Sequence, residues 1–100
     1  MLSNIALEGS LFMNEWKGTI QLRDVKAFVE VDFIVPSAVG YGSWQGRGNT
    51  ESIIEMDTYE SDIGTIVMEH ISYGVNGTTF TFKGSGKPRG KLIEAFREAE

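Results

Sequence analysis

The chain has 100 residues, of which 41% are hydrophobic and 23% charged, with a formal net charge of −5 and no cysteine. That length supports one hydrophobic core, and the balanced composition excludes a disordered tail. No stretch approaches the roughly 20 apolar residues of a membrane span, and the first ten residues lack the basic start of a secretory signal. Without cysteine there is neither a disulfide framework nor a thiolate zinc site. We therefore expect one cytoplasmic domain that makes no membrane contact.

The first third of the chain has the alternating pattern of antiparallel strands. Residues 5–12 and 16–22 predict a hairpin joined through residues 13–15. Residues 26–35 alternate most regularly, which indicates a strand buried on one face. The side chains expected on that buried face are Ala27, Val29, Val31, Phe33 and Val35.

Residues 36–49 contain five glycines or prolines and predict a long connection that carries Tyr41, Trp44 and Arg47. Aromatic and arginine side chains are enriched at binding hot spots, and long ordered loops are often functional. Two interpretations stay open at this point. Either the loop binds a partner, or Trp44 closes one end of the core.

The middle of the chain is acidic. Between Gly48 and Phe82 there are six carboxylates and no lysine or arginine, whereas four basic residues follow between Lys83 and Lys91. Residues 51–58 predict a further strand, although their alternation is less regular. This acidic run is a candidate contact surface, and the overall negative charge disfavours direct nucleic-acid binding.

The dipeptide Asn76-Gly77 predicts a tight hairpin turn, because both residues tolerate the positive φ of a type I′ turn. With these two residues as the loop, Tyr73 would lie opposite Phe80 and Ile71 opposite Phe82. Glu69 then falls on the apolar face with Tyr73. It would act as a buried acid if the sheet enclosed a cavity, or a bulge would turn it outward to water.

Residues 84–90 predict a flexible joint, and residues 91–100 a short helix whose apolar residues include Leu92 and Phe96. A helix of that length is marginal alone and must dock on the sheet. The fold we expect is mainly β: residues 1–83 form an antiparallel sheet of five to six strands, curled into a half-barrel or small barrel, and the helix covers one opening. A β-sandwich is the alternative.

No arrangement of residues in the sequence indicates catalysis, a metal site or a cofactor. His70 is the only histidine, so neither a multi-histidine metal site nor a supported catalytic triad is available. The glycine-rich segments around residues 40–48 and 84–90 fail the spacing of nucleotide-binding motifs.

These patterns favour a noncatalytic regulator, immunity-type or inhibitor protein that contacts another protein, or forms a homodimer through an apolar second face at Phe28, Ile34, Ile66 and Met68. The alternative is a β-barrel or cavity protein that binds a small ligand, or a weak enzyme, using Glu69. An acidic mimic of nucleic acid is the third hypothesis. The binding residues predicted across these hypotheses are Tyr41, Trp44, Arg47, Glu69 and Tyr73.

Overall fold

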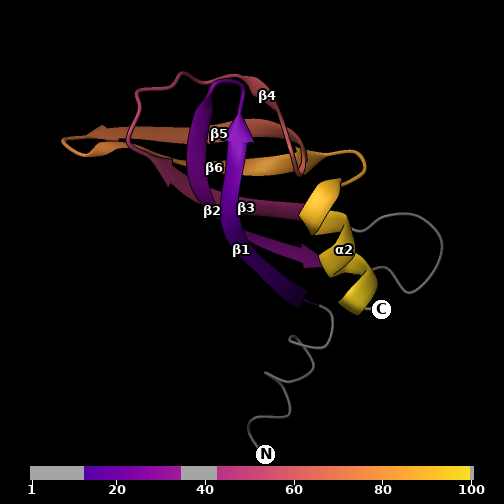
Figure 1. The fold of residues 1–100 in the computed structure, drawn as a ribbon. Coiled ribbons are helices and arrows are strands. Elements are labelled where there is room, and N and C mark those ends of the chain that lie inside the picture. Colours follow the sequence, from indigo (N-terminus) through magenta and orange to yellow (C-terminus); the bar gives the residue numbers. More distant parts are fainter. Residues whose placement is uncertain (1–12, 35–42, 100) are drawn as a thin grey trace, which may run out of the picture.

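The computed structural model describes residues 13–34 and 43–99, which form six strands and one helix (Figure 1). The strands are β1 (Met13–Leu22), β2 (Val25–Ile34), β3 (Trp44–Thr50), β4 (Thr58–Ser61), β5 (Gly64–Gly74) and β6 (Gly77–Ser85), and the helix is α2 (Gly90–Ala99). The prediction of a mainly β fold with a C-terminal helix is confirmed.

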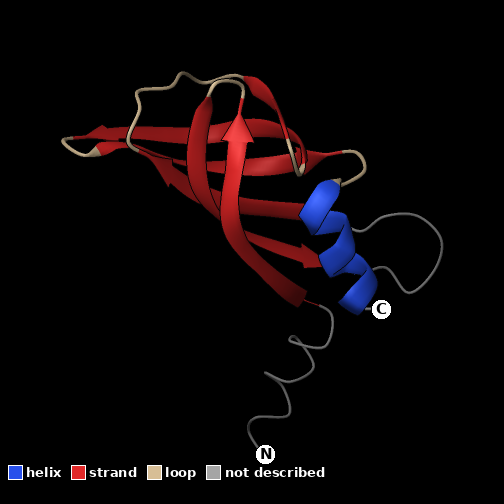
Figure 2. Ribbon diagram, viewed as in Figure 1, coloured by secondary structure: helices blue, strands red, loops and turns tan. Residues whose placement is uncertain are grey.

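All strand pairs are antiparallel, and the sheet closes into a ring in the order β1-β2-β3-β6-β5-β4. This order departs from a simple meander, because β6 rather than β4 lies beside β3. The closure between β1 and β4 is narrow: Leu22 pairs with Ser61, and the Gln21 amide donates to the Asp62 carboxylate at 3.0 Å. Figure 2 shows the strands as a curved wall with α2 at one end.

Side chains fill the inside of the ring. Strand β2 shows the simplest pattern, since Ala27, Val29, Val31 and Phe33 are all buried, as predicted. From the helix, Leu92 and Phe96 enter the same core, and the Phe96 ring stacks on Phe33 with centroids 4.3 Å apart. The helix therefore forms by docking on the barrel, which its short length requires.

Glycines on the inner face make room for the aromatic rings. A Cβ added at Gly84 would overlap the Trp44 ring, and one at Gly48 would lie 2.6 Å from Phe80. Strand β1 repeats the arrangement, with Gly18 beneath the ring of Trp16. Glycines at these strand positions therefore leave the space that the large aromatic rings occupy. The described interior is filled with side chains.

The predicted N-terminal hairpin is corrected. Residues 13–15, expected to join two strands, belong to β1 and pair with β2 from Met13 opposite Ile34. The hairpin that forms is β1–β2, and its turn holds Arg23 at a positive φ of 56°. Residues 5–12 lie outside the described part of the chain.

The β5–β6 register also differs from the prediction. Gly74 pairs with Gly77, and Tyr73 lies opposite Thr78 instead of Phe80. The turn residues are therefore Val75 and Asn76, neither of which has positive φ, while Gly77 takes φ 125°. Gly77 takes its positive φ in the residue that follows the two turn residues, whereas a type I′ turn would require positive φ at the turn residues themselves.

Two segments between the hairpins exchange their predicted roles. Residues 44–50, expected in a loop, form strand β3 between β2 and β6. Residues 51–57, expected in a strand, form a connection, and the next strand begins at Thr58. Among the residues described, no helix has the length and apolar character needed to cross a membrane.

Candidate functional site

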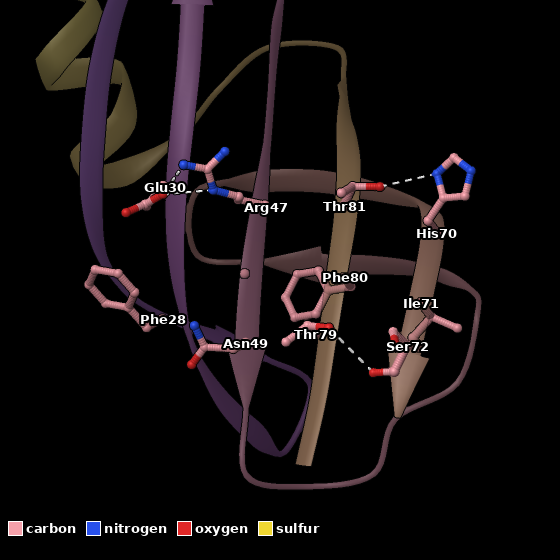
Figure 3. A pocket seen from close by; sticks show the side chains of 11 residues that line it. Phe28, Glu30, Arg47, Asn49, His70, Ile71, Ser72, Thr79, Phe80 and Thr81 are labelled. Carbon is pink, nitrogen blue, oxygen red and sulfur yellow. Dashed lines mark hydrogen bonds and ion pairs between the residues drawn. The ribbon is translucent and has the colours of Figure 1, made fainter. Parts of the chain in front are cut away.

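A groove runs over the outer face of β2, β3, β6 and β5 (Figure 3). Its main hollow has a volume of about 360 Å³, and a smaller one of about 230 Å³ adjoins it through shared residues Arg47 and Thr81. The groove takes its side chains from four strands that the sheet register places side by side.

Strand alternation explains which side chains reach this groove. Because successive residues point to opposite faces, the buried set of each strand leaves the intervening residues outside. The register aligns Glu30 with Arg47, Arg47 with Thr81, and Thr81 with His70. These four side chains form one row across the sheet, defined here as the central row.

An ion-pair network fixes the central row at the end formed by Glu30 on β2 and Arg47 on β3. The Arg47 guanidinium donates from Nε to Glu30 Oε1 at 2.8 Å, and its Nη2 lies 2.8 Å from the same oxygen. Lys17 on β1 approaches the other carboxylate oxygen at 3.8 Å. Although Arg47 is held in this way, its side chain remains 74% exposed and can donate to a bound group.

The opposite end of the central row is held loosely. The Thr81 hydroxyl lies 3.4 Å from His70 Nδ1, and His70 is exposed. A second row beside it aligns Phe28, Asn49, Thr79 and Ser72, of which Phe28 offers a ring that is 42% exposed. The groove therefore combines an aromatic face, a planar cation and neutral hydrogen-bonding groups, a mixture typical of binding surfaces.

A bulge turns Glu69 outward. The β5–β6 register shifts between Met68 and His70, so Glu69 has no partner residue opposite it. On the N-terminal side of this bulge, Ile66 and Met68 are buried and Val67 is on the outside, so the faces are the reverse of those expected from the hairpin. Of the two interpretations of Glu69, the outward-turning bulge is the one observed.

Glu69 lines the smaller hollow on the outer face, where its carboxylate lies 3.8 Å from Lys83 Nζ and its side chain is 44% exposed. The buried acid expected of a cavity protein is not found at this position. The same exchange of faces removes the predicted apolar dimer face, because Ile66 and Met68 lie in the core while Phe28 and Ile34 remain partly exposed.

Of the remaining predicted binding residues, Trp44 and Tyr73 do not reach this groove. Trp44 is 2% exposed and donates from its ring nitrogen to the Gly86 carbonyl at 3.1 Å, so it closes one end of the core. Tyr73 is exposed near the tip of the β5–β6 hairpin, where its hydroxyl donates to the Ile54 carbonyl at 2.7 Å. Tyr41 lies outside the described residues.

Two carboxylates of the acidic run are paired within the chain. Arg23 donates to Asp57 at 2.8 Å and, with the Thr58 amide, holds the pKa of that carboxyl below its ordinary range. The pKa of Glu60 is lowered chiefly by the Thr65 hydroxyl and then by Arg89, which donates to it at 2.7 Å. These pairings reduce the negative charge that this run offers to a partner.

Sequence reasoning missed most of the groove because β3 was taken for a loop. The alternation of Trp44, Gly46, Gly48 and Thr50 is the signal that would have found it, once glycine is counted as an inward residue facing a ring. Within the described ranges, no group of three or more histidine, aspartate or glutamate side chains is placed to hold a metal ion. No protein-family model, curated protein or solved structure matches this chain.

Proposed function

We propose that this chain is a noncatalytic binding protein of the cytoplasm that contacts a protein partner through the groove on β2, β3, β6 and β5. The observation that carries the proposal is the contrast between a filled interior and a groove of about 360 Å³ on the outer wall. A barrel packed with rings has no room for a ligand inside, so binding takes place on its surface.

The groove also indicates the chemistry of the partner. Phe28 accepts an apolar side chain, and the exposed Arg47 donates to a carbonyl or carboxylate. Asn49, Thr79 and Thr81 add neutral hydrogen-bonding groups along the same surface. A partner segment that alternates apolar and acceptor groups matches these features better than a densely charged polymer.

The alternatives find less support in the geometry. A cavity ligand anchored by Glu69 would need that carboxylate inside the barrel, and it lies outside. A nucleic-acid mimic would need free carboxylates along the acidic run, whereas Asp57 and Glu60 are paired with arginines. A small ligand in the outer groove is the second candidate, because the groove volume reaches the lower range of ligand sites, about 300 Å³.

The test is capture of a partner from the source cell lysate by the wild-type chain, followed by titration with the purified partner. The double variant Phe28→Ser/Arg47→Ala is expected to weaken that binding by about tenfold or more. Lys91→Ala on α2 is the control and is expected to bind as the wild type does. A wild-type chain that remains monomeric and captures no partner would overturn the proposal, as would a partner whose affinity the double variant leaves unchanged.

A further inference from the structure

A second surface lies beyond the groove, where the β5–β6 hairpin projects past the ring (Figure 1). The described residues expose seven large apolar side chains, and three of these come from two adjoining segments at that end of the molecule. We define them as the hairpin-end patch. They are Ile53, Tyr73 and Val75.

Two contacts join the segments that carry this patch. The Tyr73 hydroxyl donates to the Ile54 carbonyl at 2.7 Å, and Gly77 packs so closely on the 50–51 backbone that an added Cβ would lie 2.7 Å from the Glu51 Cα. A hollow of about 430 Å³ lies between them, lined in part by Glu51, Tyr73 and Val75.

The connection between β3 and β4 is anchored although it is not a strand. Ile54 is buried, and the Thr78 hydroxyl accepts from its amide at 3.4 Å while donating to the Ser52 carbonyl at 2.8 Å. The Tyr59 hydroxyl donates to the Glu55 carbonyl at 2.6 Å. These contacts hold the backbone in place while Ile53 remains 69% exposed and Val75 is fully exposed. A fixed surface loses little conformational freedom when a partner binds.

Charge decides which partner fits the hairpin-end patch. Glu51 and Glu55 flank Ile53 in the sequence, and neither has an ion-pair partner among the described residues. The sequence supplies no lysine or arginine from Glu51 to Phe82. Nucleic acid and an anionic lipid surface would be repelled by these carboxylates.

A second copy of the chain fits no better. In a twofold dimer the patch of one copy meets the patch of the other, so the interface would collect Glu51 and Glu55 from both copies. Like charges facing one another across an interface are unfavourable. The occupant that satisfies both the apolar centre and the acidic rim is a different protein with a basic, amphipathic segment.

We infer that the hairpin-end patch binds a basic amphipathic protein segment, with its apolar side chains against Ile53 and Val75 and its lysines or arginines beside Glu51 and Glu55. This binding is separate from that in the groove and does not depend on it. It assigns a role to exposed apolar residues that the fold does not require.

The probe is an amphipathic peptide of leucine and lysine at helical spacing, and the control peptide has glutamate in place of lysine. The full chain is titrated with each peptide, and binding is measured by calorimetry and by the NMR chemical shifts of the backbone amides. We expect the lysine peptide to bind, with shifts concentrated in residues 51–57 and 73–77, and the glutamate peptide to leave the spectrum unchanged. Higher salt is expected to weaken binding, because the charges are at the surface.

Two variants and a matched control test the surface. Ile53→Ser/Val75→Ser is expected to weaken peptide binding about tenfold, and Glu51→Gln/Glu55→Gln to remove most of its salt dependence. Val67→Ser, an exposed apolar position on β5 outside the patch, is expected to have no effect. The folded state of each variant is checked by its amide spectrum.

Three results would overturn the inference. The first is the absence of binding by the lysine peptide, and the second is a set of shifts confined to the groove around Arg47 and His70. The third is self-association of the wild-type chain in light scattering that Val75→Ser abolishes, because the occupant would then be a second copy.

Discussion

The two ends of the barrel use apolar side chains differently. At the helix end, Trp44, Phe33 and Phe96 are buried, Phe33 stacks on Phe96, and Gly64 and Gly84 leave space for the Trp44 ring. At the hairpin end, Ile53 and Val75 are exposed, although the backbone beneath them is held by buried hydroxyls. Apolar side chains at the helix end are buried and contribute to stability, whereas those at the hairpin end are exposed to solvent.

This difference teaches where binding can be sought in a small filled barrel. A ring whose described interior is filled with side chains offers its outer wall and its uncovered end, and α2 occupies the other end. The groove and the hairpin-end patch are two places where the described residues combine exposed apolar groups with a fixed backbone. Substitutions at the helix end should therefore change stability, and substitutions of exposed residues at the hairpin end should change binding.

The largest effect is expected at the helix end. Trp44→Ala removes a buried ring that contacts Gly84 and Gly64, and we expect a loss of about 3–5 kcal/mol in the free energy of unfolding, measured by denaturant titration. Val75→Ala at the hairpin tip is the control, with a change within about 0.5 kcal/mol. Equal losses in the two variants would contradict the division between the two ends.

A smaller effect is expected where the core meets the 51–57 connection. Thr78→Val keeps the volume of the side chain but leaves the Ser52 carbonyl and the Ile54 amide without their partner, which costs about 1–3 kcal/mol. Hydrogen exchange at the Ile54 amide should speed up more than exchange in β2. Thr79→Val, exposed on the same strand, is the control, and an unchanged Ile54 exchange rate in Thr78→Val would show that the hydroxyl does not hold the connection.

The sequence predicted the elements whose two faces differ clearly. Strand β2 alternates between core and solvent over its whole length, so Val29 and Val31 were placed correctly inside. The helix was placed correctly because Leu92 and Phe96 are four residues apart and lie on one face. In both elements the local pattern and the tertiary environment agree.

The prediction failed at glycines that make room for a side chain far away in the sequence. Gly46 and Gly48 have the character of loop residues, yet they are strand positions that lie beside Phe82 and Phe80 of the neighbouring strand β6. That pairing depends on strand order, which local periodicity does not contain. The groove could not be assembled from sequence for the same reason, because it requires β3 to lie between β2 and β6.

The register error in β5 has a different cause, because the bulge that turns Glu69 outward also changes which residues face the core. Periodicity assumes that a strand keeps its alternation, and a single extra residue between Met68 and His70 reverses it for the rest of β5. The Asn76-Gly77 turn was displaced by one position for a related reason, since Gly77 took the positive φ alone. Bulges and turns shift which side chains face the core, so predicted binding residues near them are the least secure.

The smallest effect concerns the acidic run between the two ends. The pKa of Asp57 is lowered in the folded chain by Arg23 and the Thr58 amide, so the charged carboxylate stabilises the folded state above its unfolded pKa, and that stability is lost as pH falls through the folded value. Asp57→Asn should therefore lower the melting temperature slightly at pH 7 and make it less sensitive to pH below about 4. Asp24→Asn is the control, because Asp24 forms no ion pair among the described residues and its electrostatic interaction with Arg23 is weaker than that of Asp57. An identical acid dependence in Asp57→Asn and the wild type would show that the exposed Arg23–Asp57 pair adds nothing to folding, as many surface ion pairs do not.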